Sequence, residues 1–144
     1  MSDTLPDIEG ALRTWLRAQS PITALVGQRV FFGVPKGATE VTFPLITVQL
    51  VDARDDDSEA PLTQALVQFD VWGSIDESGN GKKAETTVVV NTLRSVLRTV
   101  RGRTALTASV AAFGIDAVGI GWSPDPDNDR PRYVVTAEVT AVST

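Results

Sequence analysis

The stretch Leu66-Val67-Gln68-Phe69-Asp70-Val71-Trp72-Gly73 decides the fold of this 144-residue chain. Apolar and polar residues alternate along it, which is the period of a β-strand that turns one face toward a core. The predicted strand spans residues 64–72, and Gly73 begins a turn region. The residues expected on its core face are Ala65, Val67, Phe69 and Val71.

Further strands are predicted on both sides of this stretch. Residues 45–51 alternate after Pro44, and residues 29–32 resemble a short strand. Nearer the C-terminus, residues 112–122 and 132–142 are predicted to form a hairpin around a turn rich in Asp and Pro. These segments predict a mostly antiparallel sheet of about four to five strands.

Two main helices are predicted to pack on this sheet. The first follows its N-cap Asp7 and precedes a short helix at Ser20–Val26, and the second spans about residues 82–101, where Gly102 supplies a stop. The predicted buried faces are Ile8, Ala11, Leu12, Trp15 and Leu16 in the first helix and Val89, Leu93, Val96, Leu97 and Val100 in the second. Charged residues expected to form an exposed ladder on the first helix are Glu9, Arg13 and Arg17.

The order of helix, strands, helix and strands predicts an α+β fold with helices packed on one sheet. A length of 144 residues is typical of a single domain, here residues 1–144. Residues 1–6 are expected to be flexible. Residues 52–63 are expected to form an acidic loop between two strands, because they are too polar to pack and too many for a tight turn.

Composition restricts the chemistry that the chain can perform. It contains no cysteine and no histidine, which removes disulfides, thiolate metal sites and the commonest general base. An enzyme would have to use carboxylates, Lys, Ser, Thr or the single Tyr, and we predict that the protein holds no metal or cofactor. Its first residues lack the pattern of a signal peptide and no apolar run reaches the length of a membrane span, so a soluble intracellular protein is expected.

The acidic segment 52–59 carries five acids and one base. Asp55, Asp56, Asp57 and Glu59 belong to it, and a divalent-cation site is one interpretation. The segment lacks the glycine and the spaced terminal Glu of a calcium loop, so a solvated loop between two strands is favoured.

Residues 82–103 show the opposite balance, with six bases and one acid. Arg94, Arg98 and Arg101 are predicted to share one helix face. Two solvated surfaces are the simplest interpretation of these charges. A sharper one is that the basic face meets the acidic loop of a neighbouring copy in a head-to-tail ring. A DNA-binding patch is a third, which the net charge of −5 disfavours.

Trp72 lies on the mixed face of the central predicted strand. Tryptophan commonly anchors protein interfaces, so Trp72 joins the candidate interface residues, whereas Trp15 is expected in the core.

Taken in order, these elements resemble the tail completion, or tail terminator, proteins of long-tailed bacteriophages over roughly residues 5–142. The most recognisable part is the strand Gln68-Phe69-Asp70-Val71-Trp72 with the helix that ends near Leu97. The other segments that carry the resemblance are the opening helix, Ser20–Val26, residues 29–32 and residues 44–48.

The resemblance implies a structural role in the virion and no catalytic residues. Such proteins form a hexameric ring at the head-proximal end of the tail tube, where they stop tube growth and join the neck. The implied partners are further copies of the chain, the major tail tube protein and a head-neck connector protein, with DNA passing through the ring without specific recognition. The implied location is the virion tail, after assembly in the bacterial host cytoplasm.

Other classes of function remain open at this point. A small α/β ligand-binding or regulatory module would show a concave apolar pocket. A metal-dependent hydrolase would need carboxylates converging from separate elements. Within phage biology, a head-side neck protein is the nearest alternative to a tail terminator.

Overall fold

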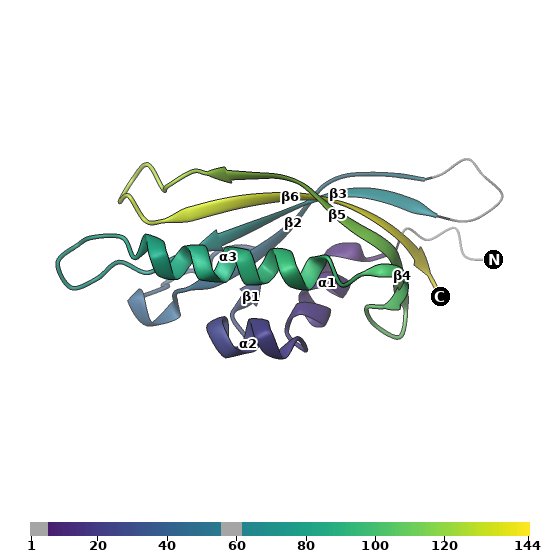
Figure 1. Ribbon diagram of the computed structural model, residues 1–144, viewed down its shortest axis with the longest axis horizontal. Coiled ribbons are helices and arrows are strands. Elements are labelled where there is room, and N and C mark those ends of the chain that lie inside the picture. The colour runs from purple at the N-terminus through teal and green to yellow at the C-terminus, as the bar shows by residue number, and fades with distance from the viewer. Residues whose placement is uncertain (1–5, 56–61) are drawn as a thin grey trace.

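A computed structural model describes residues 6–55 and 62–144 of the chain. These residues form an α+β domain with six strands and three α-helices (Figure 1). In chain order the elements are α1 (Ile8–Leu16), α2 (Ser20–Val26), β1 (Val30–Phe31), the 3-10 turn η1 (Glu40–Thr42), β2 (Leu45–Asp55), β3 (Thr63–Trp72), α3 (Lys83–Leu97), β4 (Arg101–Ala105), β5 (Val110–Trp122) and β6 (Arg132–Ser143).

The strands form one sheet in the order β1-β2-β3-β6-β5-β4. All neighbouring strands are antiparallel except β1 and β2, which are parallel through Val30 opposite Ile46 and Phe31 opposite Thr47. The predicted α+β class is confirmed, but the sheet is mixed and larger than the predicted four to five strands. The sequence pattern missed β4, an exposed edge strand without alternation.

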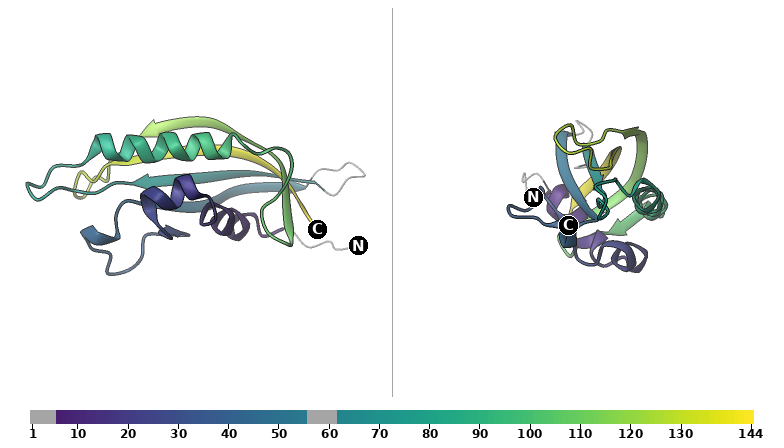
Figure 2. Two further views of the ribbon diagram at one scale, coloured as in Figure 1. Left: turned by 60° about the horizontal axis from the view of Figure 1, so that its bottom comes forward. Right: turned by 90° about the vertical axis from the view of Figure 1, so that its left-hand side faces the viewer.

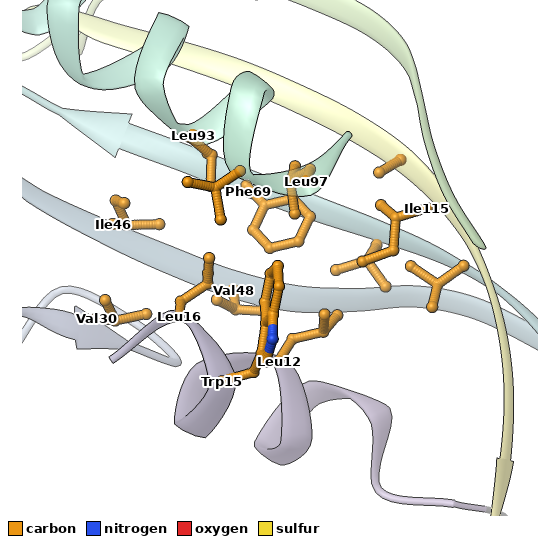
Figure 3. Close-up of a cluster of buried hydrophobic side chains, with 14 of the residues drawn as sticks. Leu12, Trp15, Leu16, Val30, Ile46, Val48, Phe69, Leu93, Leu97 and Ile115 are labelled. Atoms are coloured by element: carbon orange, nitrogen blue, oxygen red, sulfur yellow. The ribbon is translucent and has the colours of Figure 1, made fainter. Parts of the chain in front are cut away.

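The three helices pack on one face of the sheet (Figure 2). Between them and the strands lies the core, in which Phe69 of β3 sits among side chains of α1, α3 and the neighbouring strands (Figure 3). The predicted core residues of β3 are all buried, as are those of both predicted helix faces, including Trp15. The opposite, open face of the sheet carries mostly polar side chains, among them Gln64, Gln68 and Glu138.

Gly73 directly follows β3, at a position where there is no room for a side chain. A Cβ atom at this position would collide with the Oγ1 atom of Thr86, on the first turn of α3. The chain therefore leaves the central strand directly beneath α3, and the backbone N–H of Gly73 donates to the carbonyl of Pro131 at 2.8 Å. The glycine at the end of the deciding stretch thus fixes how closely α3 approaches the sheet.

Helix α1 begins as predicted, because the carboxylate of Asp7 accepts a hydrogen bond from the backbone N–H of Gly10 at 3.0 Å. The prediction of an exposed charge ladder is wrong. Glu9 accepts the backbone N–H of Leu50 on β2 at 2.7 Å, while the guanidinium groups of Arg13 and Arg17 lie over the rings of Phe32 and Phe31 respectively. These side chains attach α1 to the edge of the sheet.

Helix α3 is shorter than predicted and ends at Leu97, with Arg98 as its C-cap. Gly102 is not the helix stop. It lies within β4 with a φ of +85°, between the two residues where the β4–β5 register shifts. Arg101 consequently belongs to strand β4 and not to the basic face of the helix, which corrects its predicted position.

The predicted acidic loop at residues 52–63 is also too long. Asp52 to Asp55 continue β2 and Thr63 starts β3, so both strands extend into it. The remaining acids Asp56, Asp57 and Glu59 lie outside the described residues. At the N-terminus, residues 1–5 are likewise outside, whereas Pro6, which was expected to be flexible, is buried.

Among the described residues, no helix combines the length and apolar character that crossing a membrane requires.

The position of Phe69 predicts a large effect of truncation. Phe69→Ala should lower the free energy of unfolding by about 3–5 kcal/mol, because it removes a fully buried ring from a packed core. Urea unfolding followed by tryptophan fluorescence measures the loss. Val41→Ala, at a side chain that is 86% exposed, serves as the control and should stay within about 0.5 kcal/mol of the parent. Equal effects of the two substitutions would contradict the assigned core.

Candidate subunit interface

The basic residues predicted to act together are divided between two elements. Arg94 is half-buried on α3, and its Nε atom is buried without a hydrogen-bond partner among the described residues. Arg98 is exposed at the helix C-cap, and Arg101 is exposed on β4. Together with exposed Arg103 they form a basic surface, here called the α3–β4 basic end. The positive charge of Arg98, at the C-cap, interacts favourably with the negative C-terminal end of the α3 dipole.

The acidic counterpart begins on β2. Asp52 and Arg54 are exposed near the end of this strand, and Asp55 is its last residue. The predicted interface residues Asp56, Asp57 and Glu59 follow outside the described part, so no distance relates them to the basic end. Strands β2 and β4 lie toward opposite edges of the sheet. Within one described chain, the two charged surfaces are therefore separated by β3, β6 and β5.

Trp72 is half-buried and held by contacts within the chain. Its Nε1 atom donates to the Oγ1 of Thr47 at 3.1 Å, and the guanidinium carbon of Arg132 lies 4.9 Å from its ring centre. Asp70 neighbours this pair, with its carboxylate 3.9 Å from Arg132. These contacts fix the orientation of the indole. Its use as an interface anchor remains a prediction.

A buried arginine that no sequence pattern singled out joins three loops. Arg130 donates to the carboxylate of Glu40 and, at 2.9 Å, to the backbone carbonyl of Gly73, while its guanidinium carbon stacks 3.6 Å from the ring centre of Phe43. Arg130 and Glu40 lie far apart in sequence, in segments without periodicity. No local signal could have paired them.

The Arg130 contact has an electrostatic consequence for Glu40. The hydrogen bond from Arg130 lowers the pKa of the Glu40 carboxyl below its ordinary value of 4.5, against the opposing effect of burial, and the N–H of Ile75 adds to the lowering. Glu40 is therefore an ionised anchor at neutral pH.

Three acids occur on the open face of the sheet. Asp52, Asp116 and Glu138 line a hollow there that also includes Arg54. Within residues 6–55 and 62–144, no group of three His, Cys, Asp or Glu side chains is placed to hold a metal ion. The α3–β4 basic end and the charged end of β2 remain the candidate interface.

Comparison with known proteins identifies the family of this chain. A family model described as "Tail completion protein gp17" matches residues 10–142. The chain belongs to this tail completion family. No curated protein matches its sequence.

A solved structure shares the fold. It is a chain of a structure titled "Virion of native gene transfer agent (GTA) particle", which matches with a TM-score of 0.67 at 16% sequence identity and covers 95% of each chain. Family membership makes this tail completion protein a structural component of a phage-like virion, and the expected resemblance is confirmed.

The lowered pKa of Glu40 predicts a pH-dependent contribution to stability. A carboxyl whose pKa is lower in the folded state stabilises the fold fully above its unfolded pKa, and this contribution is lost as the pH falls through the folded pKa. The melting temperature of Glu40→Gln should therefore lie below that of the parent at pH 7, and the gap should close as the pH falls below 4.5. A gap that stays constant from pH 7 to pH 3 would contradict this role for Arg130 and Glu40.

Proposed function

We propose that this tail completion protein caps the head-proximal end of a phage tail tube as a hexameric ring. In this role it ends polymerisation of the major tail tube protein and presents a surface to a head-neck connector protein. DNA passes through the ring without specific recognition, and the parts assemble in the bacterial host cytoplasm.

The observation that carries the proposal is the family match over residues 10–142. It covers nearly the whole chain, so the tail completion role belongs to the domain and not to an appended segment. The shared fold with a chain of a gene transfer agent virion supports the same class of protein.

The distribution of charge suits a ring. A head-to-tail contact joins two different surfaces of the same chain and closes when the rotation between copies allows it. The α3–β4 basic end and the acid-rich end of β2 are two such surfaces, and they lie toward opposite sides of the sheet. The net charge of −5 also suits a channel that must not retain DNA, since retention depends on clustered basic side chains.

Purified protein and purified tail tubes provide the test of this function. Added protein should bind one end of each tube, arrest further polymerisation of tube subunits, and appear as a ring in negative-stain images. A protein that stays monomeric and neither binds tubes nor arrests their growth would overturn the proposal.

Charge reversal at the basic end should weaken assembly. Exposed ion pairs contribute only about 0.2–1 kcal/mol each, but a ring repeats every contact around its circumference. Arg98→Glu should therefore shift assembly to higher protein concentration in light scattering, and added salt should do the same to the parent protein by screening. Asp56→Lys should restore part of the loss if that acidic segment is the partner.

The matched control is Lys36→Glu, which makes the same reversal at an exposed position between β1 and β2. It should leave assembly unchanged. Urea unfolding of each variant checks that the subunit itself is intact. Normal assembly of Arg98→Glu at low salt, together with no effect of salt on the parent, would show that the basic end is an ordinary solvated surface.

A further inference from the structure

Half of strand β5 forms a free edge of the sheet. On its outer side β5 pairs with β4 only as far as Gly114, and no described strand pairs with that side over the stretch from Asp116 to Trp122 (Figure 1). The N–H of Ser123 points inward, to the carbonyl of Arg132 at 2.9 Å. The N–H and C=O groups of successive residues point to alternate sides of a strand. Those of Trp122 and Ile120 therefore point to the free side.

The β2 and β4 edges carry charged side chains. On β2, β1 covers Ile46 and Thr47, and Glu9 takes the N–H of Leu50. Beyond that, β2 exposes the charges of Asp52 and Arg54. Strand β4 exposes two arginines. Charged side chains of this kind protect an edge against non-specific pairing and leave it to a partner of opposite charge.

The free half of β5 has little such protection. Its only charged residue is Asp116, and its exposed side chains include Val118 at 56%, Ile120 at 41% and Trp122 at 41%. Lys83 lies over the Trp122 ring, 4.4 Å from its centre, yet the indole remains substantially exposed. An unpaired edge bordered by large apolar side chains is a template for another strand.

Two glycines leave the open face of this half-strand bare. An added Cβ atom at Gly119 or Gly121 would meet nothing within 4 Å, and neither residue has a positive φ. A side chain at either position is therefore tolerated within the described chain, which makes both positions suitable for probe substitutions.

We propose that the free half of β5 binds the acid-rich end of β2, from Val51 to Asp55, of a second copy of this chain, so that neighbouring sheets join edge to edge. The proposal rests on the ring of the proposed function. Three antiparallel pairings separate β2 from β5, so the two strands run in opposite directions within one sheet. Copies arranged head to tail would therefore continue the antiparallel order.

This direction also matches the charges. In an antiparallel pair, the end of β2 lies beside the beginning of the free half, next to the position where Arg101 on β4 pairs with Gly114. The stretch from Val51 to Asp55 carries two acids, Asp52 and Asp55, and one base, Arg54. These two acids would thus lie toward the α3–β4 basic end of the neighbour. Pairing of β5 with another β5 would bring no acids to these arginines. The β2 edge is accordingly the occupant that the charges favour.

Disulfide trapping tests the contact directly, because the chain has no cysteine of its own. Gly119→Cys with Arg54→Cys, and Gly121→Cys with Asp52→Cys, place opposed thiols on the open face in one antiparallel register, and Gly119→Cys with Asp52→Cys samples a register shifted by two residues. Mixing two single-cysteine proteins under mild oxidation should give disulfide-linked heterodimers for at least one pairing. Val41→Cys, exposed in η1 and outside both strands, should give none with either partner.

A charge on the free edge supplies an independent arm. Ile120→Glu should leave the subunit folded, because the side chain at this position is 41% exposed. It should raise the concentration needed for assembly at least tenfold, since a charged side chain discourages pairing of an edge and this one repels the acids of β2. Val41→Glu is the matched control, because it places the same charge at an exposed side chain outside both strands. It should assemble like the parent.

The outcomes separate the two proposals. A ring that forms without any heterodimer, together with normal assembly of Ile120→Glu, overturns the β5–β2 contact and leaves the proposed function standing. Homodimers of Gly119→Cys in place of heterodimers also overturn it. Heterodimers from a protein that neither forms rings nor binds tail tubes would support the contact and overturn the function.

Discussion

The structure depends on the pairing of β3 with β2 on one side and β6 on the other. This central strand is paired with β6 along its full length and, apart from one shift in register, with β2 as well. Its inward side chains, above all Phe69, are then covered by α1 and α3 (Figure 3). Burial on one face sets the register, because a slip of one residue would turn the whole apolar row to the open face. The remaining elements are arranged around this strand.

A sheet built outward from its centre leaves its edges to be finished in different ways. Glu9 accepts a backbone N–H of β2 and arginines flank β4, while the Gly119–Trp122 end of β5 is left apolar and unpaired. For a monomer this difference would invite aggregation. For a structural component of a virion, the unprotected edge is the place where we propose a subunit contact.

The sequence predicted the features that depend on residues close together in the chain, such as helix caps and the alternation of a strand. Asp7 caps a helix through a contact three residues away, and the alternation around Phe69 follows directly from burial on one face. Contacts between segments far apart in the sequence could not be predicted from such local patterns. Glu9 meets Leu50, and Glu40 meets Arg130, in pairs that no periodicity links. The β4 strand exists because β5 lies beside it, so its own residues carried no strand pattern, and Arg101 was assigned to the preceding helix.

Candidate site residues were predictable only in part for the same reason. Charge counting predicted two segments of opposite charge, but it could not place β2 and β4 toward opposite edges of one sheet, because strand order is a long-range property. The free edge of β5 left no trace in the sequence pattern, because pairing on the outer side of a strand also depends on the order of strands in the sheet.

The most direct measurement is a reconstruction by electron cryomicroscopy of the protein bound to the ends of tail tubes. A single ring of six copies at one end of each tube, with the β5 edge of every copy lying beside β2 of the next, is the expected result. Single bound subunits, or a ring in which the β5 edges face solvent, would contradict the assembly of this tail completion protein through its sheet edges.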